Sequence, residues 1–186
     1  MKIVAFAATN SKKSLNNQLI HYASALIKSE ILQGADIEII DLNDFEMPIY
    51  SIDREQDSGI PALAHRFFDT IGASDALIIS YAEHNGCYTT AFKNILDWIS
   101  RINMRVFQDK PMVILSASVG IKGGSSVMRI AQESAPFFGA IVKSTLSIGS
   151  FNDNFDNQSG KLTNATLNQK LKLALQALIP IEKLQS

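Results

Sequence analysis

The chain has 186 residues, of which 46% are hydrophobic and 19% charged, and its formal net charge is −1. This length and composition suit one globular domain and exclude a disordered chain. The near-neutral charge, with no basic stripe, argues against a nucleic-acid partner. A single cysteine excludes an internal disulfide, and the apolar run near the N-terminus is too short to cross a membrane. We therefore expect a cytoplasmic protein with one domain, residues 1–186, and no membrane contact.

Apolar runs and segments with helical periodicity alternate along the whole chain. The apolar runs are nearly continuous, as in strands covered on both faces, and span residues 2–8, 35–42, 75–82, 110–118 and 140–148. Apolar residues three and four positions apart predict helices over residues 14–32, 62–74, 89–104, 123–139 and 163–180. The polar passage 43–61, which contains prolines, is predicted to be a surface loop with little regular structure.

This alternation favours an open parallel sheet with helices on both faces. Five units in a chain of this length fit the flavodoxin-like strand order better than a six-stranded dinucleotide-binding fold, and the eight units of a barrel would not fit. We therefore predict an α/β fold, a flavodoxin-like three-layer sandwich with a five-stranded parallel sheet in the order 2-1-3-4-5.

Ligands of such sheets bind beyond the carboxyl ends of the strands. Three connectors should meet there, namely residues 9–16, 81–90 and 116–124, which follow the first, third and fourth predicted strands. All three are polar and rich in small residues, whereas the connectors at the opposite edge are plain turns. The sequence thus predicts a functional edge before any motif is considered.

The first connector has the composition of an anion site. Amides at the start of the following helix are unpaired, and the helix dipole attracts negative charge. Hydroxyl and amide groups and two lysines can add to this, and they belong to Thr9, Ser11, Lys12, Lys13, Ser14 and Asn16. Neither a P-loop nor a G-x-G-x-x-G motif is present, which disfavours classical ATP hydrolysis and a classical NAD fold. In the alternative interpretation, Ser14 only caps the helix and the lysines are solvated.

Two further motifs make the chain resemble the NADPH-dependent FMN reductase family, which includes quinone, azo-dye and chromate reductases. The family pattern P-E-Y-N followed by L-K-N-x-x-D-W appears here as A-E-H-N at residues 82–85 and F-K-N-I-L-D-W at residues 92–98. The third connector, S-A-S-V-G-I-K-G-G, is similar to the family's S-x-S-x-G-x-x-G. The first connector, A-T-N-S-K-K-S-L-N, matches the family's phosphate loop in kind, with Ala8 for its glycine and Ser11 for its arginine.

The resemblance implies an FMN-dependent oxidoreductase. NADPH or NADH would pass a hydride to flavin N5 with ping-pong kinetics, and the electrons would go on to a small acceptor such as a quinone, an azo compound, a metal oxyanion or free flavin. It implies a homodimer or homotetramer. The cofactor carries the chemistry, so we expect binding residues, no catalytic side chain and no metal site. The implied FMN-binding residues are Thr9, Ser11, Lys12, Ser14, Leu15, Asn16, Ala82, Glu83, His84, Asn85, Gly86, Ser116, Ser118, Gly120 and Gly123. Because serine cannot give the bidentate phosphate contact of arginine, we expect weaker flavin binding than is usual in the family.

Individual residues leave alternatives open. Trp98 has the apolar spacing of a packing residue in the core or an interface, which we favour over a cofactor contact. His84 either contacts the flavin and titrates near neutral pH or is a plain loop residue. Lys93, Asp97 and Arg101 stand four apart and can form an ion-pair ladder on a helix. Cys87 is not expected to be a nucleophile.

Other functions remain open at this point. A flavodoxin-type electron carrier would not be an enzyme, but such carriers tend to be strongly acidic, whereas this chain has a net charge of −1. A flavin-binding module without enzymatic activity is the second alternative. In the third, FMN is a substrate that leaves after reduction.

Overall fold

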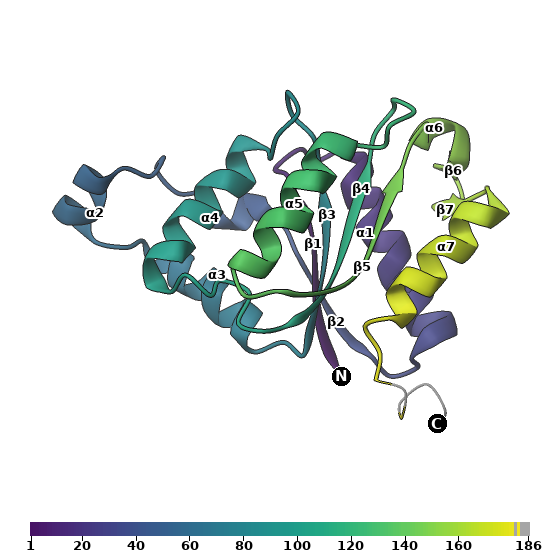
Figure 1. The fold of residues 1–186 in the computed structure, drawn as a ribbon, viewed down its shortest axis with the longest axis horizontal. Helices are drawn as coiled ribbons and strands as arrows, with labels where there is room; N and C mark the ends of the chain where they lie inside the picture. Colours follow the sequence, from purple (N-terminus) through teal and green to yellow (C-terminus); the bar gives the residue numbers. More distant parts are fainter. Residues whose placement is uncertain (181, 183–186) are drawn as a thin grey trace.

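The structure, a computed structural model, describes residues 1–180 and 182 of the chain. Its centre is a parallel five-stranded sheet in the order β2-β1-β3-β4-β5 (Figure 1). The strands are β1 (Lys2–Ala8), β2 (Asp36–Ile40), β3 (Ala76–Tyr81), β4 (Pro111–Ala117) and β5 (Ile141–Ile148). The predicted fold and strand order are confirmed.

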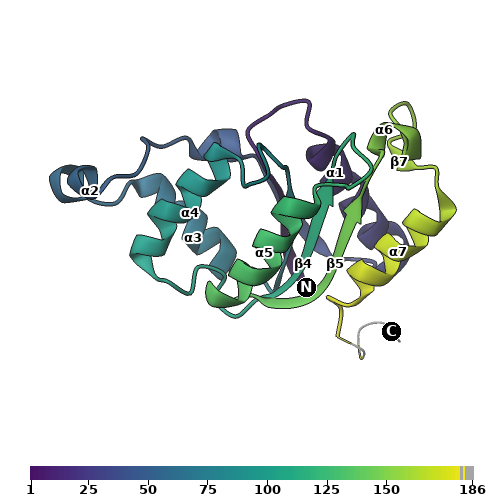
Figure 2. The same ribbon diagram turned by 45° about the horizontal axis from the view of Figure 1, so that its top comes forward.

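Helices cover both faces of the sheet, as the turned view in Figure 2 also shows. One face carries α1 (Leu15–Leu26) and α7 (Ala165–Gln176), and the other carries α3 (Ala62–Gly72), α4 (Thr90–Ile102) and α5 (Ser125–Phe137). The loops that follow the strands gather at one edge, at the top of Figure 1.

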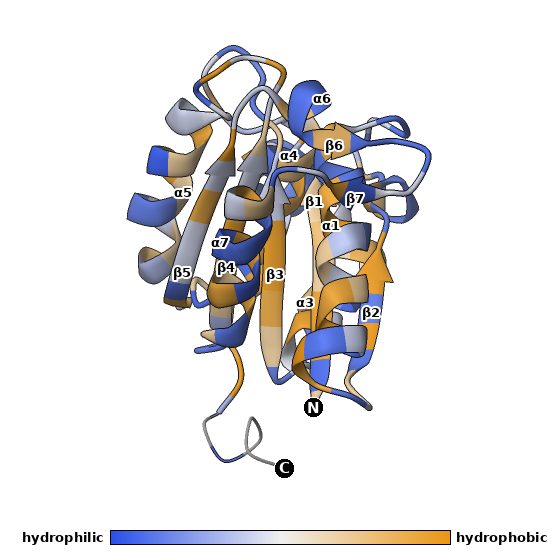
Figure 3. Cartoon of the chain, turned by 90° about the vertical axis from the view of Figure 1, so that its right-hand side faces the viewer, coloured by the Kyte–Doolittle hydropathy of each residue, from blue (hydrophilic) through white to orange (hydrophobic). Residues whose placement is uncertain are grey.

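Alternate residues of the strands feed the two cores. In β1, Val4 and Phe6 belong to the cluster under α3, α4 and α5, whereas Ile3 and Ala5 belong to the cluster under α1 and α7. All four side chains are fully buried. Burial on both faces explains why this strand is a continuous apolar run, and β3 is likewise mostly orange in the hydropathy colouring of Figure 3.

The prediction that residues 43–61 form a surface loop with little regular structure is wrong. This passage contains most of the 3-10 helix η2 (Leu42–Phe45) and all of the α-helix α2 (Ile52–Ser58), which projects at the far left of Figure 1. Ser51 caps α2 by accepting a hydrogen bond from the Arg54 amide, and Gly59 ends the helix with a φ of 73°. No residue of α2 is buried, so the helix has no apolar periodicity that the sequence could reveal.

Two smaller features were also not predicted. The end of the first predicted helix is a π-helix, η1 (Ile27–Ile31), and its C-cap Leu32 has an extended conformation. After β5 the chain forms the short helix α6 (Phe151–Asn154) and the antiparallel pair β6 (Phe155–Asp156) and β7 (Lys161–Leu162). No helix of the described residues is long and apolar enough to cross a membrane.

Candidate functional site

The three predicted loops meet at the carboxyl edge of the sheet around a cleft of about 300 Å³. The first loop and the start of α1 contribute Thr9, Ser11, Lys13, Ser14, Leu15 and Asn16. The second loop contributes Ala82, Glu83 and His84, and the third contributes Ala117, Ser118 and Val119. The convergence predicted from the strand order is therefore present in the structure.

Six of the predicted residues do not line this cleft. Lys12 faces a smaller hollow of about 90 Å³ on the other side of the first loop, which it shares with Thr9 and Ser11. The remaining five are turn or support positions of the second and third loops, namely Asn85, Gly86, Ser116, Gly120 and Gly123.

The first loop presents free amides at the start of α1. The Ser14 hydroxyl caps the helix by accepting a hydrogen bond of 3.2 Å from the Asn16 amide. Within the described chain, no hydrogen bond joins the amides of Lys12, Lys13 and Leu15 to another residue. These donors, the helix dipole and two exposed lysines suit an anionic group such as a phosphate. Ser14 can therefore cap the helix while the same loop binds an anion.

Asn16 ties this loop to the sheet. Its Oδ1 accepts hydrogen bonds from the Ala117 amide at 2.9 Å and the Ser80 hydroxyl at 2.8 Å, and its Nδ2 donates to the Ala117 carbonyl at 3.1 Å. The residue is 3% exposed. Its side chain therefore holds α1 against the ends of β3 and β4, which sets the distance between the first and third loops.

Glu83 in the second loop caps a helix. Its Oε2 accepts hydrogen bonds of 3.0 Å from the amides of Ser126 and Val127, in the first turn of α5. The N-cap position itself is Gly124, which has no side chain to accept these bonds. Glu83 thus joins the second loop to the helix that follows the third loop.

The tip of the second loop is a two-residue turn. The backbones of His84 and Cys87 exchange two hydrogen bonds, of 3.0 and 3.1 Å. Asn85 and Gly86 between them have φ angles of 53° and 77°. An Asn-Gly pair is the preferred sequence for a turn with two left-handed residues, so the sequence itself carries a signal for this turn.

The third loop is shaped by Ser116 and Gly123. The buried Ser116 hydroxyl lies 2.7 Å from the Gly123 carbonyl oxygen and 2.9 Å from the Ser147 hydroxyl. Gly123 has a φ of 61°, and a Cβ at this position would lie 2.7 Å from the Gly149 nitrogen. Only glycine fits here. The loop tip between them exposes the apolar side chains of Val119 and Ile121.

A second hollow lies beside the cleft and was not predicted. This groove, of about 240 Å³, runs between residues 42–49 and the N-terminal half of α4. His84 lines both the groove and the cleft. The other lining residues are Asn10, Leu42, Asn43, Phe45, Glu46, Met47, Ile49, Thr89, Thr90, Ala91, Asn94 and Ile95. The groove was missed because its outer wall belongs to the passage that the sequence indicated to be irregular.

The tyrosines beneath the second loop are not candidate bases. Burial raises the pKa of Tyr81 well above 10 and also raises the pKa of Tyr88, which shares a hydrogen bond with Ser134. Both rings pack against Phe92, with centroids 5.2 and 5.1 Å from its own. They stay protonated near neutral pH and support the loop from below.

The residues of the K-N-x-x-D-W motif form contacts within the chain. Trp98 is 1% exposed, lines neither hollow and donates a hydrogen bond of 2.7 Å to the Pro48 carbonyl, so it is a packing residue as favoured from the sequence. Lys93 and Asp97 form the expected ion pair at 2.6 Å. Arg101 does not continue the predicted ion-pair ladder with Asp97, because it pairs with Glu55 of α2 at 2.9 Å instead.

Comparison with known proteins agrees with this arrangement. The family model for NADPH-dependent FMN reductases matches residues 1–153. A probable NADPH:quinone oxidoreductase of rice (Oryza sativa subsp. japonica) is 29% identical over 96% of this chain and 90% of its own. An NAD(P)H-dependent FMN reductase of Pseudomonas aeruginosa is 28% identical over 96% of this chain and 93% of its own. Among solved structures, a flavoenzyme NAD(P)H:(acceptor) oxidoreductase from Paracoccus denitrificans has a TM-score of 0.76 at 20% identity, covering 95% of this chain and 94% of that one.

Proposed function

The chain belongs to the NADPH-dependent FMN reductase family, a family of oxidoreductases that work with FMN and NADPH, and we propose that the three-loop cleft is where this chain holds its flavin. The FMN phosphate would lie on the first loop, and the ring system would lie along the second and third loops. The observation that carries the proposal is the convergence of all three loops on one cleft, with free amides at the end formed by α1.

The residues of the first loop fit a phosphate. The amides of Lys12, Lys13 and Leu15 would donate hydrogen bonds to it, and the Ser11 and Ser14 hydroxyls can add two more. Lys13 lines the cleft and supplies positive charge, and Lys12 does so from the adjoining hollow. Asn16 would act indirectly, by keeping the loop in register with β4.

The second and third loops fit a flat ring system. Ala82 and His84 of the second loop and Ser118 of the third loop line the cleft, and Glu83 joins the second loop to the start of α5. The turn residues Asn85 and Gly86 fix the backbone next to His84, which lines the cleft. Ser116, Gly120 and Gly123 would act by fixing the shape of the third loop.

The reaction we propose has two half-reactions that use the same site in turn, with ping-pong kinetics. NADPH or NADH gives up a hydride and leaves as NADP⁺ or NAD⁺, and a small acceptor then takes two electrons and leaves reduced. FMN, when bound, supplies the hydride-accepting chemistry. The protein binds and orients the partners, and no side-chain acid or base is assigned. The acceptor class includes quinones, azo compounds, metal oxyanions and free flavin.

One observation favours a second candidate, in which FMN is a substrate that leaves after reduction. The family's arginine is Ser11 here, so the phosphate loop depends on amides and on lysines that make point-charge contacts. Weaker holding of the phosphate would allow the flavin to exchange. The dissociation rate of FMN compared with turnover distinguishes the two candidates.

We also propose that residues 1–186 act as one FMN-binding reductase domain, in a reducing, cytoplasmic compartment, and as a homodimer or homotetramer. Exposed apolar side chains on and near α2 and the end of α4 support assembly with a second copy. These are Ile52 and Met104, at 51 and 48% exposure. Light scattering of the purified protein measures the assembly state, and a monomer at micromolar concentration would contradict this part of the proposal.

Flavin-binding titrations test the proposed site. Flavin fluorescence is followed while the flavin-free protein is added to FMN and, separately, to riboflavin, which lacks the phosphate. We expect FMN to bind at least tenfold more tightly, because the phosphate provides the contacts with the first loop. Equal affinity for the two flavins would contradict the phosphate loop, and binding of neither would contradict the proposed function.

A further inference from the structure

The segment of residues 47–50 has no regular secondary structure and is held mainly by side chains of α4, with Arg54 of α2 donating to the Ile49 carbonyl. Among the described residues, no backbone-to-backbone hydrogen bond involves residues 46–50. Asn94 supplies three of the contacts instead, because its Oδ1 accepts from the Tyr50 amide at 2.8 Å and its Nδ2 donates to the Met47 and Pro48 carbonyls at 3.0 and 3.1 Å. The Trp98 indole supplies a fourth, to the Pro48 carbonyl.

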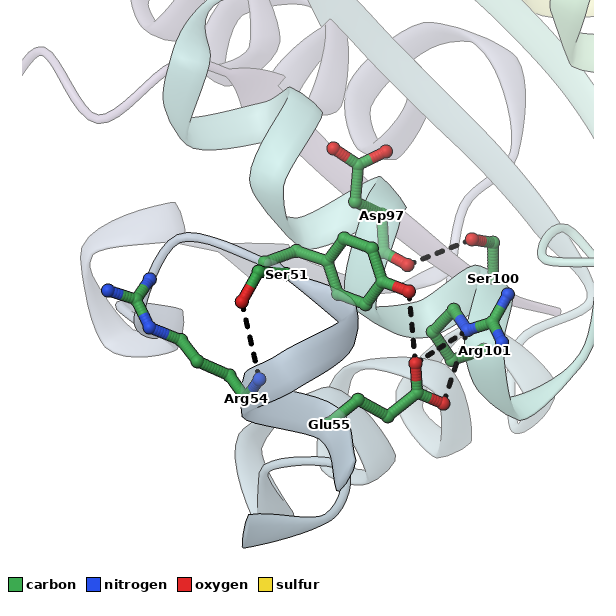
Figure 4. Close-up of polar contacts among 7 residues, drawn as sticks. Ser51, Arg54, Glu55, Asp97, Ser100 and Arg101 are labelled. Atoms are coloured by element: carbon green, nitrogen blue, oxygen red, sulfur yellow. Dashed lines mark hydrogen bonds and ion pairs between the residues drawn. The ribbon is translucent and has the colours of Figure 1, made fainter. Parts of the chain in front are cut away.

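A second set of contacts, some of them shown in Figure 4, joins the following helix, α2, to α4. Glu55 of α2 accepts a hydrogen bond from Arg101 at 2.9 Å, labelled in Figure 4. It accepts another from the Tyr50 hydroxyl at 3.0 Å. The Tyr50 ring meets the edge of Trp98 with centroids 5.0 Å apart. Because α2 itself buries no residue, these contacts with α4 determine where it and the preceding segment lie.

The held segment is the outer wall of the groove beside the proposed flavin site. Met47 and Ile49 line the groove from this side, and Asn94 and Ile95 line it from α4. His84 connects the groove with the cleft, so a molecule in the groove would lie next to the ring-binding loops. Glu46 is the one carboxylate among the described lining residues, and no lysine or arginine lines the groove. The described lining mixes apolar side chains with amide and hydroxyl groups and carries no lysine or arginine, which suits a neutral, partly polar ring such as a quinone.

We infer that Asn94 and Trp98 are positioning residues for the electron acceptor, which act by fixing the 47–50 segment as the wall of its binding groove. The inference rests on the proposed function, because the groove serves an acceptor only if the adjacent cleft holds the flavin. It gives the Asn and Trp of the K-N-x-x-D-W motif a role within the chain that its helical spacing does not reveal.

The test uses the full-length protein loaded with FMN, in three variants and one control. Asn94→Leu removes three hydrogen bonds at similar side-chain size, and Trp98→Phe keeps a ring against Tyr50 but removes the indole donor. Ile49→Ala shortens the groove wall at a side chain that is 65% exposed, so it leaves the hydrogen bonds of Asn94 and Trp98 and the folding intact. Lys93→Gln is the matched control, because it lies next to Asn94 on α4 and loses only a surface ion pair.

Three readouts separate positioning from general damage. Hydrogen exchange reports residues 46–50, the KM and kcat for 1,4-naphthoquinone report the acceptor step, and anaerobic reduction by NADPH together with the Kd for FMN reports the flavin site. We expect Asn94→Leu to accelerate exchange of the Tyr50 amide by about tenfold, since this amide loses its hydrogen bond to Asn94 Oδ1. Trp98→Phe should accelerate it less, because the indole bonds the Pro48 carbonyl and protects no amide directly. We expect both, and Ile49→Ala, to raise the KM for the quinone by about fivefold to tenfold, and Ile49→Ala to leave exchange unchanged.

The flavin readouts should stay within about twofold of the wild type in all variants, and Lys93→Gln should match the wild type throughout. Faster exchange with an unchanged quinone KM would overturn the positioning role, and so would an unchanged KM in Ile49→Ala. If the wild-type protein bound FMN but neither NADPH nor NADH reduced it, the proposed function would fail and the acceptor role with it. In that case the exchange data would still show whether Asn94 holds residues 47–50. Failure of the positioning role and failure of the proposed function are therefore distinguishable.

Discussion

Replacing Asn16 by alanine should be among the most damaging single changes at the candidate site. The substitution removes three hydrogen bonds at a residue that is 3% exposed, and it leaves the Ala117 amide and carbonyl and the Ser80 hydroxyl without partners. A buried backbone group without a partner costs about 1–3 kcal/mol, and the Ser80 hydroxyl can rotate to lose less. We therefore expect the free energy of unfolding to fall by about 3 kcal/mol.

Urea unfolding followed by circular dichroism measures this loss. At this chain length about 3 kcal/mol corresponds to a fall in Tm of about 6–12 °C. Asn17→Ala is the control, because the neighbouring residue makes no side-chain hydrogen bond within the described chain and is only half-buried. A loss below about 1 kcal/mol in Asn16→Ala, or an equal loss in both variants, would refute the view that Asn16 ties the first loop to the sheet.

Three further predictions concern the flavin loops and the tyrosines beneath them. Ser11→Arg should lower the Kd for FMN by about tenfold, because arginine restores a bidentate phosphate contact, and an unchanged Kd in a fluorescence titration would count against the phosphate loop. Gly123→Ala should destabilise the protein by about 2 kcal/mol in thermal unfolding, since the added Cβ would lie 2.7 Å from the Gly149 nitrogen at a φ of 61°. An unchanged stability would contradict the requirement for glycine at this position. Stability should also fall as the pH rises above about 10. Burial holds the pKa of Tyr81 well above 10 in the folded chain, whereas tyrosine in the unfolded chain loses its proton near pH 10. Above that pH the unfolded state binds fewer protons, so urea midpoints should decrease, and midpoints that stay constant from pH 9 to 11 would contradict the burial argument.

The parts of the fold that could be predicted are those with buried, periodic side chains. Both faces of β1 are buried, and α4 has a strongly apolar side, so their patterns in the sequence are clear. Helix α2 buries nothing and is held to α4 by Glu55, whose partner Arg101 lies 46 residues away in the sequence. Contacts of this kind leave no periodic signal, which is why the sequence of residues 43–61 predicts little regular structure.

The candidate site was predictable at the level of loops and less so at the level of single residues. Strand order alone brought the three loops together, because the carboxyl ends of parallel strands share one edge. The roles of Glu83 and Asn16 depend on which backbone groups they meet across the fold, and those groups lie 43 and 101 residues away. The groove was not predictable, since its wall follows from contacts that Asn94 makes with an irregular segment.

Anaerobic reduction of the FMN-loaded protein by NADPH tests the central claim most directly. The absorbance of bound flavin near 450 nm is followed while NADPH is added in steps, and a quinone is then added without oxygen. The account predicts complete bleaching at about one NADPH per bound FMN and a return of the colour with the quinone. Flavin that binds in the cleft but stays oxidised with excess NADPH and with excess NADH would contradict it.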